Sequence, residues 1–311
     1  AGGGVVASSG KAKFALRKAG ARWFARRKDV GGEEFLAGVV VDQPAKNYHG
    51  LHFPVAAYYG PTFDAAEHEA AIGPWAYLLE VSVACESKGR FNLINTYDRA
   101  RFTYGFYQLA AHTPGDNLIL YFREAMALPQ FRALFPDLEL RGGRLVQVTP
   151  GGGTVNLEAV THDAATGEDQ LQNFMAYLNP TRASVDETEV LNAAKLVWWA
   201  NERPEGNALQ ARVAAQILKG KVNRRYNGWY DLDGRSDVVC AIVADIHHQG
   251  RAKRDAVAKA LKAAVPETAL LKLGEGDYGE RIATLRARIA HWKSAGRMGK
   301  KRYDAASNAF V

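Results

Sequence analysis

The stretch from residue 85 to residue 108 decides the fold. It opens with CESKGR (residues 85–90), which ends an apolar run typical of a buried helix, and it continues to DRARFTYGFYQ (residues 98–108). Apolar and polar positions alternate between residues 91 and 109, and a period of two predicts short strands. The sequence therefore predicts a helix that ends near Glu86, followed by a small sheet whose loop carries Asp98.

Glu86 and Asp98 are the candidate catalytic carboxyl groups. Cleavage of a glycosidic bond needs one protonated carboxyl to donate to the leaving oxygen and a second, ionised carboxyl to activate water. A carboxyl at the end of an apolar helix has a raised pKa, whereas one in a polar, Arg-rich loop stays charged. These surroundings predict that Glu86 is the acid and Asp98 the base. The competing interpretation is a solvated surface Glu and an Asp that only shapes its loop.

The residues around this pair resemble the active-site stretch of two glycosidase families. Goose-type lysozymes have a helix-end Glu, an Asp-Arg loop and a Gly-Phe strand, to which this chain is similar at Glu86-Ser87, Tyr97-Asp98-Arg99 and Gly105-Phe106-x-Gln108. Family 46 chitosanases have an Asp-x-Arg-Gly-Tyr-Thr-x-Gly loop and a following Gly-Asp, which this chain resembles at Asp98, Phe102-Thr103, Gly105 and Gly115-Asp116. The resemblance covers about forty residues, from Val81 to Tyr121.

The resemblance implies a fold and a mechanism. Both families share the lysozyme-like fold, so the expected class is α+β and mainly helical, with a small β-sheet lobe and a substrate groove between two lobes. The matching residues imply that Glu86 is the general acid, that Asp98 is the base, and that Thr103 helps to hold the attacking water in an inverting reaction. Two departures, Ala100-Arg101 in place of Arg-Gly and Ala110 in place of a second Asp, leave Asp116 as a reserve candidate for the base.

Substrate contacts are expected from the same loop and from one aromatic run. The predicted contact residues are Tyr97, Arg99, Tyr104, Gln108, Asp116, Trp229 and Tyr230, the last two in a turn-rich segment. No cofactor and no metal is expected. His247 and His248 are adjacent and therefore point to different sides of a helix, which does not suit metal ligation. The triple glycine at residues 151–153 fits a hairpin turn and lacks the Lys-Ser or Lys-Thr of a phosphate-binding loop.

The chain is expected to consist of an N-terminal segment, residues 1–63, packed on a catalytic body, residues 64–311. The basic and aromatic pattern of residues 11–28 predicts a basic amphipathic helix or an extended arm. The irregular pattern of residues 30–63 predicts loops and short strands. The body is expected to open with two helices that break at Gly73-Pro74 and begin at Thr62 or Asp64. Further predictions are a helix capped by Asp116, a hairpin over residues 144–160, and helices over residues 186–200, 206–219, 236–248, 252–264 and 277–294.

Composition limits the possible classes. The chain has 311 residues, of which 47% are hydrophobic, enough for one large domain or two lobes. The chain contains no run of eighteen apolar residues that could span a membrane. The opening Ala1-Gly2-Gly3-Gly4 lacks the charged start and apolar centre of a signal peptide, but processing would have removed such a segment. We therefore expect a periplasmic or secreted protein. The two cysteines, Cys85 and Cys240, lie in apolar helical patterns and are expected to be buried free thiols.

Charge favours peptidoglycan as the substrate. The net charge is +7, and the basic residues concentrate in residues 1–28 and 286–302, which carry eight and seven Lys or Arg and no acid. Residues 86–123 carry five basic and three acidic residues, which suits a neutral or anionic glycan better than polycationic chitosan. Chitosanase activity is the first alternative. The second is a non-catalytic protein that binds cell wall or nucleic acid, although only Trp23 and Phe24 accompany the basic residues as aromatics for nucleic acid.

Overall fold

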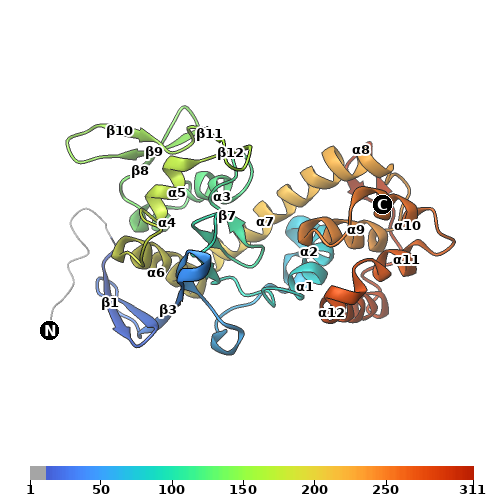
Figure 1. Ribbon diagram of the computed structural model, residues 1–311, viewed down its shortest axis with the longest axis horizontal. Helices are drawn as coiled ribbons and strands as arrows, with labels where there is room; N and C mark the ends of the chain where they lie inside the picture. The colour runs from blue at the N-terminus through green and yellow to red at the C-terminus, as the bar shows by residue number, and fades with distance from the viewer. Residues whose placement is uncertain (1–11) are drawn as a thin grey trace. The chain divides into compact units, whose positions relative to one another are not determined.

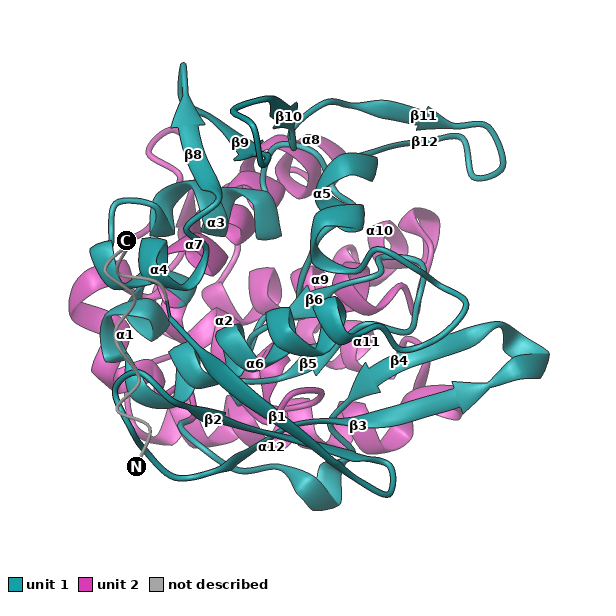
Figure 2. Ribbon diagram, turned by 90° about the vertical axis from the view of Figure 1, so that its left-hand side faces the viewer, with its two compact units in different colours: residues 1–61, 90–210 teal, residues 62–89, 211–311 magenta. Residues whose placement is uncertain are grey.

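The computed structural model describes residues 12–311 and divides into two compact units. Unit 1 contains the described residues up to Pro61 together with Arg90–Gln210, and unit 2 contains Thr62–Gly89 and Ala211–Val311 (Figure 2). The chain passes from one unit to the other after Pro61, after Gly89 and, inside a helix, after Gln210. Each unit is therefore assembled from segments that are distant in the sequence.

Unit 1 begins with a four-stranded antiparallel sheet. Its strands follow the order of the chain, β1 (Phe14–Ala19), β2 (Arg22–Arg27), β3 (Phe35–Gln43) and β4 (Tyr48–His52), with the 3-10 helix η1 (Pro44–Lys46) between the last two. A two-residue turn joins β1 to β2, and Gly20 adopts the positive φ of 59° that such tight turns require.

This sheet corrects the prediction of a helix or an arm over residues 11–28. Alternate side chains of β1, Phe14 and Leu16, pack with Phe35 against a small cluster of Ala25, Ala37 and Ala194. Ala194 belongs to helix α6 (Glu187–Glu202), and β1, β2 and β3 all contact that helix (Figure 1). The period-2 packing explains the strands, and it makes the N-terminal segment part of unit 1 rather than a separate arm. Ala1–Gly4 and Lys11, which also figured in the predictions, lie outside the described residues.

The remainder of unit 1 combines short strands with helices. Three strands form the small sheet predicted around Asp98: β5 (Ile94–Asn95), β6 (Thr103–Tyr104) and β7 (Leu109–Ala110). The predicted hairpin is confirmed as β9 (Arg144–Val148) and β10 (Thr154–Asn156), which pair in one antiparallel sheet with β8 (Leu138–Arg141). The other elements are η2 (Val55–Ala57), α3 (Leu118–Ala125), α4 (Pro129–Leu134), the hairpin β11 (Thr161–Asp163) and β12 (Glu168–Gln170), α5 (Gln172–Leu178), α6 and the start of α7 (Pro204–Lys221).

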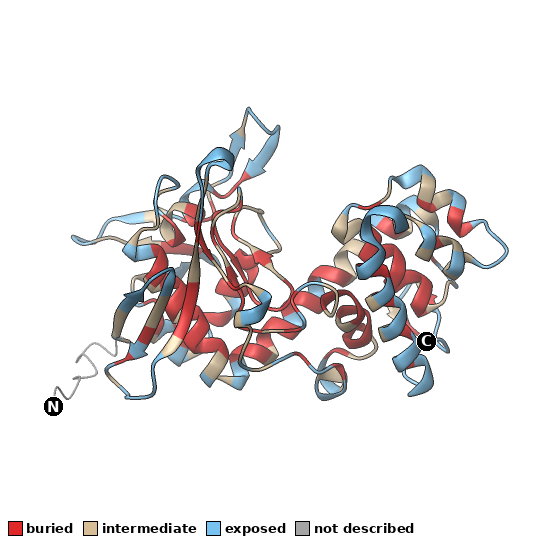
Figure 3. Cartoon of the chain, turned by 60° about the horizontal axis from the view of Figure 1, so that its bottom comes forward, coloured by how far each residue is buried: buried red, intermediate tan, exposed pale blue. Residues whose placement is uncertain are grey.

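An aromatic cluster forms the core of unit 1. Phe131 lies at its centre and contacts the rings of Tyr121, Phe122, Phe135 and Trp199 at centroid distances between 5.1 and 6.2 Å. The two polar atoms inside the cluster are paired, because Trp199 Nε1 donates to the Tyr121 hydroxyl at 2.8 Å and that hydroxyl donates to the Gly206 carbonyl at 3.0 Å. Buried residues concentrate in this way inside each unit, coloured red in Figure 3.

Unit 2 is mainly helical. Helix α2 (Trp75–Val83) is buried at every position except Glu80 and packs against α9 (Asp237–Gln249). Around this pair lie α1 (Ala65–Ile72), the end of α7, the π-helical turn η3 (Val222–Tyr226), α8 (Asn227–Tyr230), α10 (Arg254–Leu261), α11 (Pro266–Lys272), α12 (Glu275–Ser294) and the two-stranded sheet of β13 (Tyr303–Asp304) and β14 (Ala309–Phe310).

Local sequence signals account for some of the helix ends. The Asp64 side chain caps α1, and Gly73-Pro74 separates α1 from α2 as predicted. The five later helices predicted from periodicity correspond to α6, α7, α9, α10 and α12, with bounds shifted by a few residues. The prediction for Asp116 is wrong, because the residue before α3 is Asn117. Its side chain does not cap the helix; its Oδ1 accepts a hydrogen bond from the Ala110 amide instead, which ties the helix start to β7.

The structure is compatible with the expected α+β class, since small antiparallel sheets accompany a larger number of helices. Cys85 and Cys240 are both free, as predicted, although Cys85 is only partly buried. Across the described residues, no helix combines the length and apolar character needed to cross a membrane.

Candidate functional site

Glu86 lies one turn beyond the end of α2, in unit 2. Its amide donates to the Val83 carbonyl at 3.1 Å, which continues the helix by a final turn. Its carboxylate reaches two helices of the same unit: Oε1 accepts a hydrogen bond from Arg281 Nη1 of α12 at 2.6 Å, and Oε2 lies 3.3 Å from His248 Nε2 of α9. The side chain is 37% exposed, so it is fixed by two partners and still open to solvent.

A buried chain of charges holds the Arg281 side chain in place. Arg281 Nη2 donates to Asp245 Oδ1 at 2.7 Å, and Arg251 Nη1 donates to Asp245 Oδ2 at 2.6 Å. The Ser82 hydroxyl completes the site by donating to Asp245 Oδ1 at 2.5 Å. The side chains of Asp245 and Arg251 are fully buried, so this carboxylate is satisfied by the two guanidinium groups and one hydroxyl. Glu86 is thus the solvent-exposed end of a charge network that starts in the core of unit 2.

The surroundings of Glu86 correct the predicted pKa. Partial burial works to raise the pKa of this carboxyl, but the hydrogen bond and charge of His248, together with Arg281, outweigh it and hold the pKa below its ordinary value. The apolar helix end on which the prediction rested is real, yet the side chains of His248 and Arg281, from distant parts of the sequence, contact the carboxylate there. In the free protein Glu86 therefore favours its ionised form.

Asp98 lies in unit 1, in the loop between β5 and β6. Its Oδ1 accepts a hydrogen bond from the Ala100 amide at 3.0 Å, and its carbonyl accepts one from the Arg101 amide at 3.0 Å, so the residue forms a tight turn. Burial raises the pKa of Asp98 above its ordinary value, and the Ala100 amide, His112 and two arginines offset this only in part. The polar loop was predicted to keep this carboxyl ionised, and the direction of the shift is again the reverse.

The two candidate carboxyl groups belong to different units, and neither unit by itself brings them together. Thr103 shares unit 1 with Asp98. It lies in β6, where it is opposite Asn95 of β5 and Ala110 of β7, and only 7% of its surface is exposed.

The predicted contact residues near Asp98 have different surroundings. The Tyr97 ring packs against Tyr48 at 5.1 Å and stays partly exposed, as a sugar-stacking ring must. Arg99 is exposed and pairs with Glu168 at 2.6 Å. Gln108 has a positive φ of 54° and donates from Nε2 to the Gly105 carbonyl at 2.7 Å, so its side chain closes the turn between β6 and β7.

Tyr104 and Asp116 are more buried than a residue in open contact with substrate. Tyr104 has no exposed surface and packs against Tyr121 at 5.8 Å in the core. A ring without exposed surface cannot contact a glycan, and the substrate-binding prediction for Tyr104 is therefore wrong. Asp116 lies partly buried in the turn before α3, where its amide donates to the Pro114 carbonyl at 3.1 Å. Its role as a reserve base stays a prediction.

Trp229 and Tyr230 form part of an aromatic cluster on α8, in the same unit as Glu86. The guanidinium of Arg254 covers the Trp229 ring at 4.3 Å, and the Tyr230 hydroxyl lies 2.7 Å from His247 Nε2. His247 thus belongs to this cluster, whereas His248 faces Glu86, as the geometry of adjacent helix positions predicts. Within residues 12–311 no group of three or more His, Cys, Asp or Glu side chains has the arrangement of a metal site.

Sequence reasoning missed the network behind Glu86. The signal was present in α9, where Asp245 interrupts an otherwise apolar run from Val238 to Ile246. A charged residue on a helix that is apolar all round must be buried, and a buried carboxylate needs a partner. That rule predicts a cation for Asp245, but it does not predict that Arg251 and Arg281 supply it.

Glu189 is a second buried carboxyl that sequence reasoning passed over. It has no exposed surface, forms a capping box with Asp186 at the start of α6, and accepts hydrogen bonds from the Thr96 hydroxyl and from Asn179 Nδ2. Burial raises the pKa of Glu189 to about 7. Asp186 followed three residues later by Glu189 is the sequence signature of a capping box, which identifies the helix start but not the burial.

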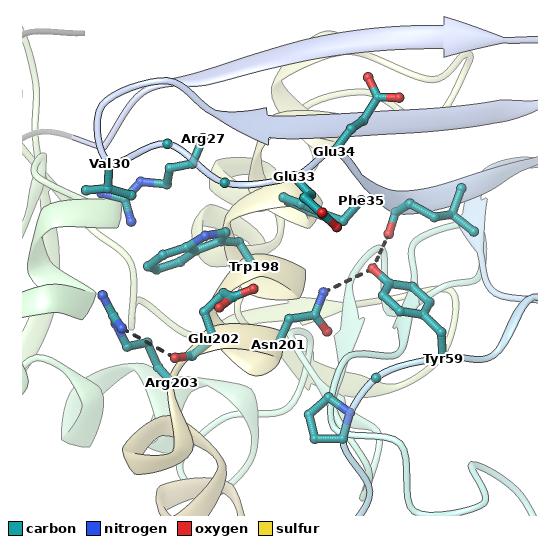
Figure 4. Close-up of a pocket in the computed structure, with 15 residues that line it drawn as sticks. Arg27, Val30, Glu33, Glu34, Phe35, Tyr59, Trp198, Asn201, Glu202 and Arg203 are labelled. Carbon is teal, nitrogen blue, oxygen red and sulfur yellow. Dashed lines mark hydrogen bonds between the residues drawn. The ribbon is translucent and has the colours of Figure 1, made fainter. Parts of the chain in front are cut away.

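A large cavity of unit 1 lies apart from these residues. It has a volume of about 870 Å³ and is lined by the β2–β3 loop, Tyr59 and the end of α6 (Figure 4). Trp198 lies at its base between the guanidinium groups of Arg27 and Arg203, which are 4.1 and 5.1 Å from the ring centroid. No predicted site residue lines it. No protein-family model, curated protein or solved structure matches this chain.

Proposed function

We propose that this protein is a glycoside hydrolase with a lysozyme-like fold that cleaves β-1,4 bonds of an aminosugar polymer, with peptidoglycan as the substrate. Glu86 is the general acid, Asp98 the base, and Thr103 assists the attacking water in an inverting reaction. The observation that carries the proposal is the environment of Glu86, a solvent-accessible carboxylate fixed by Arg281 through a charge network that is otherwise buried. A surface ion pair needs no such support.

The directions of the two pKa shifts run against these roles, because the pKa of Glu86 is lowered while that of Asp98 is raised. Glycosidases instead raise the pKa of the general acid and keep the second carboxyl ionised. Under the proposed roles the reactive form has Glu86 protonated and Asp98 ionised. The proposal therefore implies that activity is highest in acid, where Glu86 takes up its proton.

Peptidoglycan is favoured over chitosan by the charge near Asp98. Arg99 and Arg182 both act electrostatically on the Asp98 carboxyl, and Arg101 follows in the same loop. A polycationic chain is repelled by such a loop, whereas a glycan that carries carboxylates is attracted. A protein that acts on cell-wall glycan works outside the cytoplasm, so a periplasmic or secreted location is part of the proposal.

The test compares the unaltered protein with Glu86→Gln on purified cell walls and on chitosan. We expect release of reducing ends from walls, little from chitosan, and a loss of about a hundred- to ten-thousand-fold in the variant, the range typical of removing a general acid. Release from chitosan alone would favour a chitosanase. Wall binding without any cleavage, unchanged in the variant, would favour a non-catalytic binding protein and refute the proposal.

An activated substrate separates the two roles. An aryl glycoside with a good leaving group needs no proton from the enzyme, so Glu86→Gln is expected to keep most of its activity on such a substrate, whereas Asp98→Asn loses activity on both. The reverse pattern would exchange the roles of the two carboxyl groups. NMR of the first product anomer checks inversion.

A further inference from the structure

A second cavity of unit 1 lies directly behind the Asp98 loop. It has a volume of about 580 Å³ and is lined by three arginines, Arg99, Arg101 and Arg182, together with the β11–β12 hairpin and the start of α5. Arg99 and Arg101 belong to the loop that Asp98 opens, and Arg182 lies between α5 and α6. Three cations from two separate segments therefore meet at one cavity beside a candidate catalytic carboxyl.

Arg101 is the most unusual of the three. Only 7% of the residue is exposed; its Nη2 donates to the Asn179 carbonyl, and its Nε has no hydrogen-bond partner. The Arg101 backbone has a positive φ of 62°. Asn179 Nδ2 donates to the Arg101 carbonyl at 2.9 Å, so Asn179 holds both the backbone and the guanidinium of Arg101 in place. A buried guanidinium with an unpaired donor is costly unless an acceptor completes it.

The cavity carries more positive than negative charge. Among the described residues, no carboxylate forms an ion pair with Arg101 or Arg182. Burial and then the charge of Arg182 lower the pKa of Arg101, and the charge of Glu189 offsets this only in part. The one carboxylate in the lining, Asp163, already accepts hydrogen bonds from the Ala165 amide at 2.8 Å and from Gln170 Nε2 at 3.3 Å. No direct ion pair within the lining therefore neutralises these two guanidinium groups.

We propose that this cavity binds the carboxylate of a short acidic peptide carried by the glycan, with Arg101 and Arg182 as its partners. A planar guanidinium binds a carboxylate through two parallel hydrogen bonds, and both Arg101 and Arg182 line the cavity. The volume exceeds the needs of a single carboxylate and suits a few residues of peptide. Gln172, also in the lining, can bond peptide amides. The inference rests on the proposed function, since it names the substituent that distinguishes peptidoglycan from chitosan.

Binding is tested without cleavage, on protein that carries Glu86→Gln. The probes are a muramyl dipeptide, a neutral N-acetylglucosamine oligomer and inorganic phosphate, each titrated by calorimetry at low and high salt. Arg182→Gln removes the exposed arginine of the proposed site, and Arg101→Gln removes the buried one. Arg101→Lys keeps the positive charge but loses the paired N–H donors of the planar guanidinium. Arg141→Gln, an exposed arginine on β8 that pairs with Glu139, is the matched control.

We expect the muramyl dipeptide to bind more tightly than the neutral oligomer, and each Gln variant to lose about tenfold or more of that affinity, the effect of one charge-assisted hydrogen bond. Arg101→Lys should recover only part of the loss, and Arg141→Gln should change nothing. Equal binding of the dipeptide and the neutral oligomer, or full affinity in Arg182→Gln, overturns the inference. Phosphate that binds more tightly than the dipeptide overturns it as well. If Arg101→Gln does not fold, Arg182→Gln and Arg101→Lys still decide.

The two proposals can fail separately. Dipeptide binding that depends on Arg182, in a protein that cleaves no glycan, leaves this cavity assigned and refutes the hydrolase. If the protein cleaves cell walls but its Arg182→Gln and Arg101→Gln variants bind the dipeptide normally, the hydrolase proposal stands and the assignment of this cavity is refuted.

Discussion

Arg281 Nη1 donates to Glu86 Oε1 at 2.6 Å, while the other terminal nitrogen of the same guanidinium donates to the fully buried Asp245. One side chain therefore serves both the candidate acid at the surface and the charge balance of the core. Changes at residue 281 should consequently affect the titration of Glu86 and the stability of the fold together.

Arg281→Met should raise the pKa of Glu86 and destabilise the protein. The substitution removes a hydrogen bond and a charge that hold the pKa down, and it leaves Asp245 with Arg251 and Ser82 alone. Loss of one partner of a buried ion pair costs about 3 kcal/mol. Carboxyl-carbon NMR titration and urea unfolding measure the two effects. Arg288→Met on the same helix is the control: its pair with Glu80 is partly exposed and should cost at most about 1 kcal/mol. Equal losses at both positions would contradict the buried network.

The double variant Glu86→Gln with Asp98→Asn should be no less active than the worse of the two single variants. When two groups act in the same catalytic step, the activity losses of their single variants do not multiply in the double variant, because removal of either group already abolishes the step. Rates of wall cleavage for the three variants check this prediction. Losses that multiply would show that the two carboxyl groups do not act in the same step.

Activity should decline as the pH rises from about 5 to about 7. The pKa of Glu86 lies below its ordinary value of 4.5, so the protonated form that an acid requires becomes scarcer with every increase in pH above that value. His248→Gln removes the charge of the first partner that lowers this pKa, and the decline should shift to higher pH. The profile of kcat/KM measures it. His291→Gln, an exposed histidine on α12, should leave the profile unchanged.

Exposed basic residues of the N-terminal sheet should aid adhesion to anionic cell walls. Deletion of residues 1–28 is no test of this, because it removes β1 and β2 from a sheet that packs on α6. The variant that keeps the fold replaces Lys18, Arg22, Arg26 and Lys28 by Gln, all of them exposed. We expect weaker wall binding with a flatter salt dependence, because attraction between exposed charges is screened within about 10 Å in ordinary buffers. Cleavage of short soluble oligosaccharides should persist; unchanged wall binding at low salt would contradict this role.

Glu189→Gln should make unit 1 less sensitive to pH. The pKa of Glu189 is raised to about 7 in the folded chain, so the folded state holds a proton that the unfolded state releases near 4.5. The stability that this proton provides is fully present below about pH 4.5 and is lost as the pH rises through 7, by about 3 kcal/mol. Urea unfolding between pH 4 and 8 should show this slope in the unaltered protein and a smaller one in the variant. Parallel curves would show that Glu189 is ionised in the fold.

Local patterns predicted the elements around the candidate site better than they predicted its electrostatics. The Gly73-Pro74 break, the Asp64 cap and the alternation through β5 to β7 each act within a few residues, and the structure confirms all three. The pKa of Glu86 depends on His248 and Arg281, which are more than 160 residues away in the sequence. No periodicity carries that information. Strands β1 and β2 were not predicted for a related reason. The side chains on their apolar face are buried only because α6, which is distant in the sequence, packs against them.

The packing of α2 against α9 has a consequence for synthesis. Eight of the nine residues of α2 are buried, yet α9 begins more than 150 residues after α2 ends. On the ribosome, the most apolar helix of unit 2 emerges long before its partner exists, and during this interval all of unit 1 from Arg90 onwards is translated. Such a long-range contact forms slowly, and until it forms the hydrophobic surface of α2 is exposed and prone to aggregation. The nascent chain is therefore expected to need a chaperone that binds α1 and α2 until the last hundred residues have appeared.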